Sequence, residues 1–329
     1  MEYLESAIHD PRWNLALEEY VFDCMDRSKS YLILWQNDHT IVIGKYQNAI
    51  AEINNDYVRD HGITLVRRLS GGGTVYHDLG NLNYTFIMDA DEAETINFHM
   101  FCQPIIETLA DFGVKAELTG RNDLVVDGKK FSGSAQYIRQ GRVMHHGCIM
   151  LSADLTVLGR ALHVDQEKIA SKGVKSVVSR VTNLCDYLPS GIGVEEFKAA
   201  LISHLSKKED FHPCQLSEAV LEEIARRKQA RYDTWQWNYG RSPAYSNTRR
   251  QRIEGCGTVE VSLKAEHGKL EDWELFGDFF AQRDLAELID ALRGCELRRE
   301  SVAARLAQYP PEEYIRGLNA QALSALLVP

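Results

Sequence analysis

Residues 67–78 read Arg-Arg-Leu-Ser-Gly-Gly-Gly-Thr-Val-Tyr-His-Asp. Three consecutive glycines between two strand-like runs leave backbone N–H groups unobstructed, because no Cβ keeps a ligand away. The two arginines before them carry fixed positive charge in a fork that suits phosphate or carboxylate. The stretch therefore predicts an anion site between two strands; a flexible glycine turn with two solvated arginines is the alternative. It matches neither the P-loop pattern nor the Gly-x-Gly-x-x-Gly pattern that opens a helix.

Helices and short strands alternate around this stretch. Apolar spacing predicts helices over 13–25, 52–61 and 96–112. A hairpin of two strands is expected upstream, over 31–35 and 40–44. Runs of alternating or β-branched residues predict further strands, over 63–66, 74–77, 82–88, 115–118, 124–126, 130–134 and 143–151. This order is typical of an α/β or α+β domain.

The length of 329 residues predicts about two domains. From residue 194 the pattern is mainly helical, and an aromatic, turn-rich stretch follows over 235–247. We expect a linker from about residue 233, and beyond it a small α+β unit with strands over 257–264 and 270–276. The expected domains are a main domain over 1–247 and an accessory domain over 248–329.

Charge and composition exclude several classes of protein. The chain has 37 Lys and Arg against 47 Asp and Glu, a net charge of −10, which is the wrong sign for a protein that binds nucleic acid. No apolar run is long enough to span a membrane, and the first residues carry acid where a secretion signal carries base. The 7 Cys are scattered without metal-ligand spacing. We therefore expect a cytoplasmic protein with reduced thiols and no metal-ligating residues.

A second polar segment surrounds a predicted hairpin turn at Asp127-Gly128. Before the turn, Asn122 and Asp123 either contribute to a site or only close a turn through their own backbone. After the turn comes Lys-Lys-Phe-Ser-Gly-Ser-Ala, residues 129–135. Side chains alternate along a strand, so we expect Lys130 and Ser132 on one face and Phe131 on the other. Lys130 then faces either a cleft or, if Phe131 packs in the core, solvent at a sheet edge.

Four further candidate residues lie on predicted strands. His145 and His146 are neighbours, so they point to opposite faces and cannot both bind one metal; each can also be an ordinary half-buried histidine. Cys148 shares a face with His146, which makes it a conceivable nucleophile. Trp35 ends an apolar strand and is a candidate wall for an acyl pocket, or a core residue. A basic loop over 171–176 is a candidate lid or an ordinary surface loop.

Five motifs in series resemble the lipoate-protein ligase A family in order and spacing. They are the stretch 67–78, Gly-Arg-Asn-Asp-Leu at 120–124, Lys-Phe-Ser-Gly-Ser-Ala at 130–135, His-His-Gly at 145–147 and the stretch 171–184. The resemblance continues through Trp-x-Trp-Asn-Tyr-Gly at 235–240, and residues after 248 resemble the family's accessory domain. It implies a mixed sheet flanked by helices, as in biotin protein ligases, with a small C-terminal α+β domain.

The resemblance also implies an activity: ATP-dependent activation of lipoate or octanoate to acyl-AMP, followed by transfer to a lysine. Carried over by position, the implied catalytic residue is Lys130, and the implied ligand contacts form two sets. The residues for ATP with Mg²⁺ are Arg68, Gly73, Thr74, Val75, Tyr76 and Lys130. The residues for lipoate are Trp35, Gly72, His77 and Lys130. Further candidates are Asn122, Asp123 and His146; Asp123 is a candidate to orient the acceptor amine or take its proton.

The implied partners are the lipoyl domains of 2-oxoacid dehydrogenase complexes and the glycine-cleavage H protein, with the enzyme acting as a monomer. Two other functions remain open. One is an ATP-independent octanoyl or lipoyl transferase that works through a cysteine acyl-enzyme, for which Cys148 is the candidate. The other is a module that binds a nucleotide or an acyl ligand without turnover.

Overall fold

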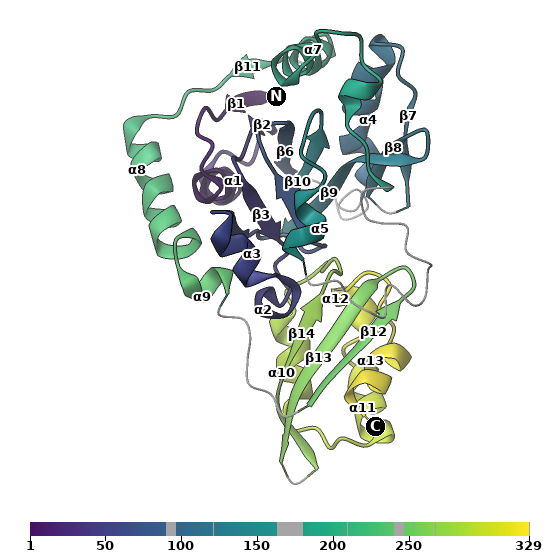
Figure 1. The fold of residues 1–329 in the computed structure, drawn as a ribbon. Helices are drawn as coiled ribbons and strands as arrows, with labels where there is room; N and C mark the ends of the chain where they lie inside the picture. Colours follow the sequence, from purple (N-terminus) through teal and green to yellow (C-terminus); the bar gives the residue numbers. More distant parts are fainter. Residues whose placement is uncertain are drawn as a thin grey trace. The chain divides into compact units, whose positions relative to one another are not determined.

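The computed structural model describes residues 1–89, 97–120, 122–162, 180–208, 210–239, 247–266 and 268–328 (Figure 1). The contacts between residues divide the chain into two compact units. Unit 1 consists of Met1–Val42, Ile50–Arg67 and Val75–Asn238, and unit 2 of Ile43–Ala49, Arg68–Thr74 and Tyr239–Pro329. The triglycine stretch thus groups with the C-terminal residues. A domain boundary at residue 248 stays a prediction.

A mixed sheet forms the centre of unit 1, as expected. Among the described residues it has eight strands in the order β11-β1-β2-β6-β10-β9-β8-β7 (Figure 1). Strand β1 runs parallel to both β2 and β11, and the other described pairs are antiparallel. In the order of the sheet the strands are His212–Pro213, Glu2–Glu5, Tyr31–Trp35, Asn81–Asp89, Arg142–Met150, Lys129–Arg139, Asp123–Val126 and Ala116–Thr119.

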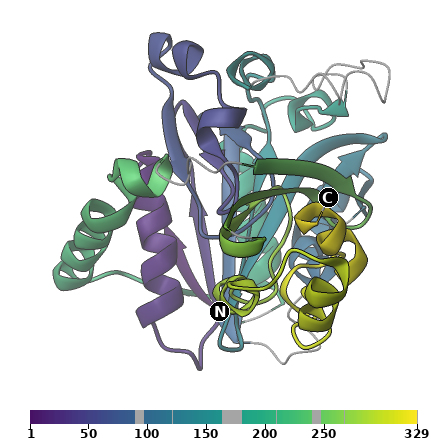
Figure 2. The ribbon, with the colours of Figure 1, turned by 90° about the horizontal axis from the view of Figure 1, so that it is seen from below.

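Helices cover both faces of this sheet. Helix α1 (Pro11–Cys24) begins after Asp10, whose carboxylate accepts a hydrogen bond from the Arg12 N–H at 2.9 Å. It lies beside α8 (Glu218–Arg227) (Figure 2). Asp23 of α1 and Arg227 of α8 form an ion pair of 3.1 Å between the two helices. The other described helical segments before residue 239 are α2 (Ala49–Glu52), α3 (Asn55–Asp60), α4 (Phe98–Asp111), α5 (Val157–Ala161), η2 (Leu184–Asp186), α7 (Val194–Ser206), the π-helix η3 (Lys228–Tyr232) and α9 (Trp235–Asn238).

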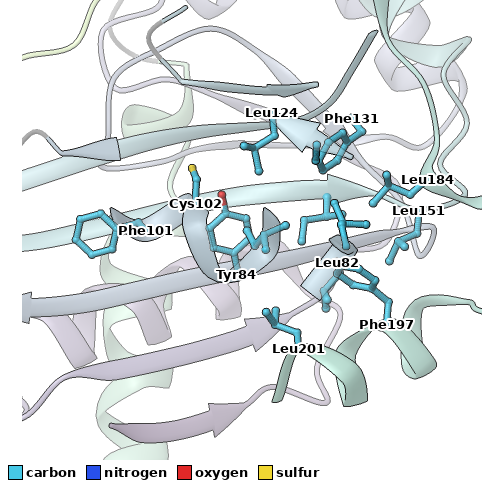
Figure 3. Packing of buried hydrophobic residues seen from close by; sticks show 14 of the residues in the cluster. Leu82, Tyr84, Phe101, Cys102, Leu124, Phe131, Leu151, Leu184, Phe197 and Leu201 are labelled. Carbon is cyan, nitrogen blue, oxygen red and sulfur yellow. The ribbon is translucent and has the colours of Figure 1, made fainter. Parts of the chain in front are cut away.

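Helices α4 and α7 cover the opposite face and enclose the main core (Figure 3). Side chains of β6, β8 and β9 meet those of the two helices there, among them Leu82, Tyr84, Leu124, Phe131, Phe101, Cys102, Phe197 and Leu201. His145 lies on this side, stacked on Phe101 at 4.6 Å between ring centroids, and burial lowers its pKa well below its usual value. His145 is therefore a neutral core residue. Burial also raises the pKa of the Cys102 thiol to about 11.

The expected hairpin of residues 31–35 and 40–44 is wrong. Both strands form, but β2 pairs with β1 and β6, whereas β3 (Thr40–Ile43) lies between β4 (Thr64–Arg67) and β5 (Val75–His77) in a second sheet. The intervening loop diverts the chain: His39 adopts a φ of 43°, and the Asn14 amide donates to the Asn37 side chain at 3.0 Å. The alternation of residues along a strand carries no information about a hydrogen bond between residues so far apart in the sequence.

Residues 233–238 of the segment expected to be a linker lie against the rest of unit 1. Helix α9 contacts β4, and the Arg67 backbone N–H donates to the Asn238 side-chain oxygen at 2.9 Å. The Trp237 indole donates in turn to the Arg67 carbonyl at 2.8 Å. Arg67, the first residue of the stretch 67–78, is therefore fully buried and stabilises the fold.

Unit 2 contains a three-stranded antiparallel sheet of β12 (Asn247–Ile253), β13 (Gly257–Glu266) and β14 (Lys269–Gly277). Its core is centred on buried Trp273, whose indole donates to the Ile289 carbonyl at 2.9 Å. The helices that complete it are α10 (Ala286–Leu292), α11 (Arg299–Leu306), α12 (Pro311–Tyr314) and α13 (Ala320–Leu327). The expected small α+β arrangement is confirmed.

In the part of the chain that the structure describes, no helix has the length and apolar character needed to cross a membrane.

Candidate active site

A β-bulge decides where Lys130 points. Strands β8 and β9 meet at Asp127-Gly128, where positive φ values of 49° and 73° confirm the predicted hairpin turn. Across the hairpin Leu124 faces Ser132, yet the next residue, Val125, faces Lys130, so Phe131 is an extra residue. Phe131 is fully buried in the main core, and burying a phenylalanine stabilises a fold by about 1.5–3 kcal/mol.

The bulge overturns the expected alternation. Ser132 faces Leu124 on the core side, so Ser132 and Lys130 lie on opposite faces, not on the same one. The bulge also brings Lys130 to the same face as Gly133, three residues on, which a regular strand would not allow. A Cβ built on Gly133 would lie 2.7 Å from Lys130 Nζ and 2.9 Å from its Cε. The lysine side chain therefore lies directly across the glycine.

Asp123 forms an ion pair with the Lys130 ammonium. Its Oδ1 is 2.8 Å from Lys130 Nζ, with the two side chains 39% and 33% exposed, so the ammonium remains accessible to a ligand. The backbone around them is also fixed: the Thr182 N–H donates to the Lys130 carbonyl at 2.9 Å, and the Asn122 amide donates to the Ser134 carbonyl at 2.6 Å. Lys130, Asp123 and Asn122, which the sequence analysis singled out, thus lie together.

One row of side chains crosses five strands on this face. Directly opposite residues of antiparallel strands share a face, and the register aligns one residue from each of β2, β6, β10, β9 and β8. We call these residues the cross-strand row: Trp35, Asn83, Cys148, Gly133 and Asp123. The row places the candidate wall Trp35 and the candidate catalytic Lys130, which lies over Gly133, on one continuous surface.

A buried polar network flanks the Trp35 end of the row. The Trp35 indole donates to the Thr85 hydroxyl at 3.0 Å, and that hydroxyl donates to Glu18 Oε1 from helix α1. His146 Nδ1 lies 2.9 Å from the same carboxylate oxygen. Glu18 is 1% exposed, so its interactions with Thr85 and His146 replace the water that it loses. His146 and Cys148 share this face, as expected, while His145 faces the core.

His77 and Tyr76 lie on β5. The His77 ring meets Trp35 edge-on, with 6.2 Å between ring centroids, and His77 Nδ1 is 3.3 Å from the Asn37 amide nitrogen. Tyr76 instead shares a hydrogen bond of 2.8 Å with His39 Nδ1, and burial with nearby acids raises the pKa of Tyr76 to about 12. Trp35, His77 and His146 are therefore brought together by the fold, whereas the Tyr76 hydroxyl is engaged elsewhere.

The triglycine stretch has its own contacts within unit 2. Arg68 is buried, and its guanidinium donates to the carbonyls of Gly71 and Gly73 at 2.6 and 2.8 Å. The Gly72 N–H donates to the Phe279 carbonyl at 3.1 Å. The expectation of unobstructed amides is therefore wrong for Gly72, because a carbonyl from a distant part of the chain accepts its hydrogen bond.

Glycine is required in this stretch for close packing. A Cβ on Gly71 would lie 2.3 Å from the Phe279 carbonyl oxygen, closer than atoms can approach. Thr74 at the end of the stretch donates to the Gln47 side-chain oxygen at 3.1 Å. The assignment of Arg68, Gly72, Gly73, Thr74, Val75 and Tyr76 to ligands stays a prediction.

Glu18, Thr85 and Asn83 were missed by the sequence analysis. A signal existed for Glu18: it falls in the apolar stripe of α1, three residues after Leu15 and four before Phe22, where an acid is out of place. Thr85 and Asn83 lie on a strand whose other side is apolar, and only pairing with β10 and β2 reveals their surroundings. The candidate lid over 171–176 falls outside the described residues.

Replacing Glu18 by alanine is expected to lower the free energy of unfolding by about 3 kcal/mol, because Thr85 and His146 would lose a buried partner. Chemical denaturation of the two proteins measures this. Glu222→Ala on the exposed side of α8 is the matched control and should change stability by at most about 0.5 kcal/mol. Equal denaturation midpoints for Glu18→Ala and the unmodified protein would refute the network.

Family models match almost the whole chain. The lipoyl protein ligase A/B catalytic domain matches residues 10–206, and the bacterial lipoate protein ligase C-terminus matches residues 242–327. Lipoate-protein ligase LplJ of Bacillus subtilis is 44% identical over 299 residues, which cover 90% of each chain. Lipoate–protein ligase 1 of Staphylococcus aureus is 40% identical over 320 residues, or 97% of each chain.

Solved structures share the fold. LipL1 of Plasmodium falciparum, solved in complex with lipoate, has a TM-score of 0.80 at 24% identity, covering 99% of this chain and 98% of that one. The bipartite lipoate protein ligase of Thermoplasma acidophilum, analysed with its E2 lipoyl domain, has a TM-score of 0.66 at 28% identity, covering 75% and 98%.

A lipoate-protein ligase A bound with ATP has a TM-score of 0.61 at 26% identity, covering 73% of this chain and 99% of that chain. Sequence similarity extends over both halves of the chain, and the solved folds agree with the sheet described above. The chain therefore belongs to the lipoyl protein ligase A/B family.

Proposed function

We propose that this protein activates lipoate with ATP to lipoyl-AMP and transfers the lipoyl group to a lysine of a carrier protein. The observation that carries the proposal is the ammonium of Lys130, held by Asp123 across Gly133 on the surface that Trp35 also borders. The relatives named as lipoate-protein ligases, one of them bound with ATP, support the same activity.

The charges define the first half-reaction. A carboxylate and the α-phosphate of ATP repel each other, so attack requires positive groups fixed beside both. Lys130 supplies such a group, and its ion pair with Asp123 keeps the flexible side chain in place. The lipoate carboxylate oxygen forms a bond to the α-phosphorus, and the bond to pyrophosphate breaks. Mg²⁺ bound to the phosphates of ATP would supply further positive charge beside them.

In the second half-reaction the neutral amine of an acceptor lysine attacks the acyl carbon. AMP leaves with the bonding electron pair, and the nitrogen releases its proton to solvent as the amide forms. Lys130 then stabilises the negative charge that develops on the acyl oxygen and on the departing phosphate. Asp123 is engaged with Lys130 in the structure, so we assign it to positioning that lysine. Trp35 and His77 are proposed to border the acyl chain, and Arg68 with Gly72 to Tyr76 to contact the nucleotide and the carboxylate.

The proposed acceptors are lipoyl domains of 2-oxoacid dehydrogenase complexes and the glycine-cleavage H protein, modified by a monomeric enzyme. The archaeal ligase studied with its E2 lipoyl domain supports the class of acceptor. Cys148 is the candidate for a second route, an acyl-enzyme without ATP, because it lies in the cross-strand row on the face of His146. The ligase names of the relatives favour the ATP-dependent route.

Transfer of radiolabelled lipoate to a purified apo-lipoyl domain, with and without ATP, tests the proposal. We expect label on the domain only with ATP, together with release of pyrophosphate. Cys148→Ala should retain both activities, because the thiol has no part in the adenylate route. ATP-independent transfer that is lost in Cys148→Ala would establish the acyl-enzyme route instead, and ATP binding without either product would indicate a binding module.

A further inference from the structure

Asn83 is the buried polar member of the cross-strand row that has no evident structural role. It is 0% exposed, and neither its Nδ2 nor its Oδ1 has a hydrogen-bond partner among the described residues. The neighbouring polar residues of this face differ, because Thr85 and His146 both bond to Glu18. A buried amide without a partner destabilises a protein, and such a group calls for an explanation.

The position of Asn83 in the cross-strand row indicates that the missing hydrogen-bond partner of its amide is a bound ligand. It faces Cys148 on one side and Trp35 on the other, and Cys148 faces Gly133, over which Lys130 lies. Two interstrand spacings, about 10 Å in total, separate Asn83 from Gly133. An extended eight-carbon acyl chain spans about 9 Å, given C–C bonds of about 1.5 Å. This step rests on the proposed function, in which the substrate carboxylate lies beside Lys130.

With the carboxylate at Lys130, the distal end of the acyl chain reaches Asn83 and Trp35. The two candidate acids differ at that end. Lipoate carries a dithiolane ring, whose sulfur atoms are weak hydrogen-bond acceptors, whereas octanoate ends in saturated carbon. An apolar tail against Asn83 would leave the amide unsatisfied in a dry site, and sites with buried polar groups reject such analogues.

We propose that Asn83 is a specificity-determining residue that selects an acyl tail bearing a sulfur acceptor over a saturated tail of equal length. The amide N–H donates to a dithiolane sulfur, while the Trp35 ring packs against the same end of the acyl chain. Asn83 makes no contact with the reacting atoms, since the carboxylate lies two strands away. Its contribution is therefore expected in KM for lipoate and not in kcat.

The test compares kcat/KM for lipoate and octanoate in acid-dependent pyrophosphate release from ATP. In the unmodified protein we expect a preference for lipoate of about tenfold or more. Asn83→Leu, which keeps the size and removes the amide, should reduce the lipoate-to-octanoate ratio about tenfold, mainly through KM. It should also raise Tm by a few degrees, because a buried polar group without a partner is removed.

Ile87→Val is the matched control: it alters a fully buried residue of the same strand and face, four positions along β6, and should leave the ratio unchanged. Asn83→Ser provides a second reading of the ratio if the leucine variant does not fold. An active enzyme whose ratio stays within twofold in the Asn83 variants would overturn this inference alone. If the unmodified protein released pyrophosphate with neither lipoate nor octanoate, the proposed function would be overturned as well.

Discussion

Lys130→Ala is expected to reduce lipoate-dependent pyrophosphate release by about 100- to 1,000-fold, the range found when a fixed charge-stabilising group is removed from a reaction centre. The ammonium is accessible and held 2.8 Å from Asp123, while the backbone beneath it is bonded to Thr182. The fold should therefore survive the substitution and only the charge should disappear. Pyrophosphate release and transfer to an apo-lipoyl domain, measured separately, report on the two half-reactions.

Lys129→Ala is the matched control, because Lys129 is the exposed neighbour on the same strand and faces Val126 outside the row. It should leave both half-reactions within about twofold of the unmodified protein, as expected for a surface substitution. Normal pyrophosphate release from Lys130→Ala would show that adenylation does not depend on this ammonium and would refute the role assigned to it. Transfer without ATP that is lost in Cys148→Ala would support the cysteine route.

Gly133→Ala is expected to lower the same activity by about 10- to 100-fold, although the new methyl group is far smaller than any substrate. The Cβ would lie 2.7 Å from Lys130 Nζ, so the lysine must leave its position across the strand. A displacement of about 1 Å in a catalytic group is enough for a loss of this size. The clash involves the flexible end of a side chain, so the denaturation midpoint should change little.

A double-variant cycle isolates this effect. In a protein that already carries Lys130→Ala, Gly133→Ala should have no further effect, because the group that it displaces is absent. Gly159→Ala, at an exposed helical position with no atom within 4 Å of the added Cβ, is the control and should leave activity unchanged. Full activity in Gly133→Ala, or an additive loss in the double variant, would show that Lys130 does not act from the position described.

Local sequence signals were sufficient for most elements. Helix α1 begins within two residues of its expected start, and the Asp127-Gly128 turn forms with the expected positive φ values. The spacing of the five motifs was sufficient for the family, and with it for the mixed sheet, whereas the catalytic role of Lys130 stays a prediction. Each of these features depends on residues close in the sequence, whose periodicity and turn chemistry act over a few positions.

Strand partners and side-chain surroundings were settled only by the folded chain. Phe131 forms a bulge because the core takes its ring, and this turns Lys130 toward Gly133, against simple alternation. Glu18 reaches Thr85 and His146 across 67 and 128 residues of sequence, and Asn83 joins a row contributed by four other strands. Register and burial are properties of many distant contacts at once, and a period of two or 3.6 residues carries no information about them.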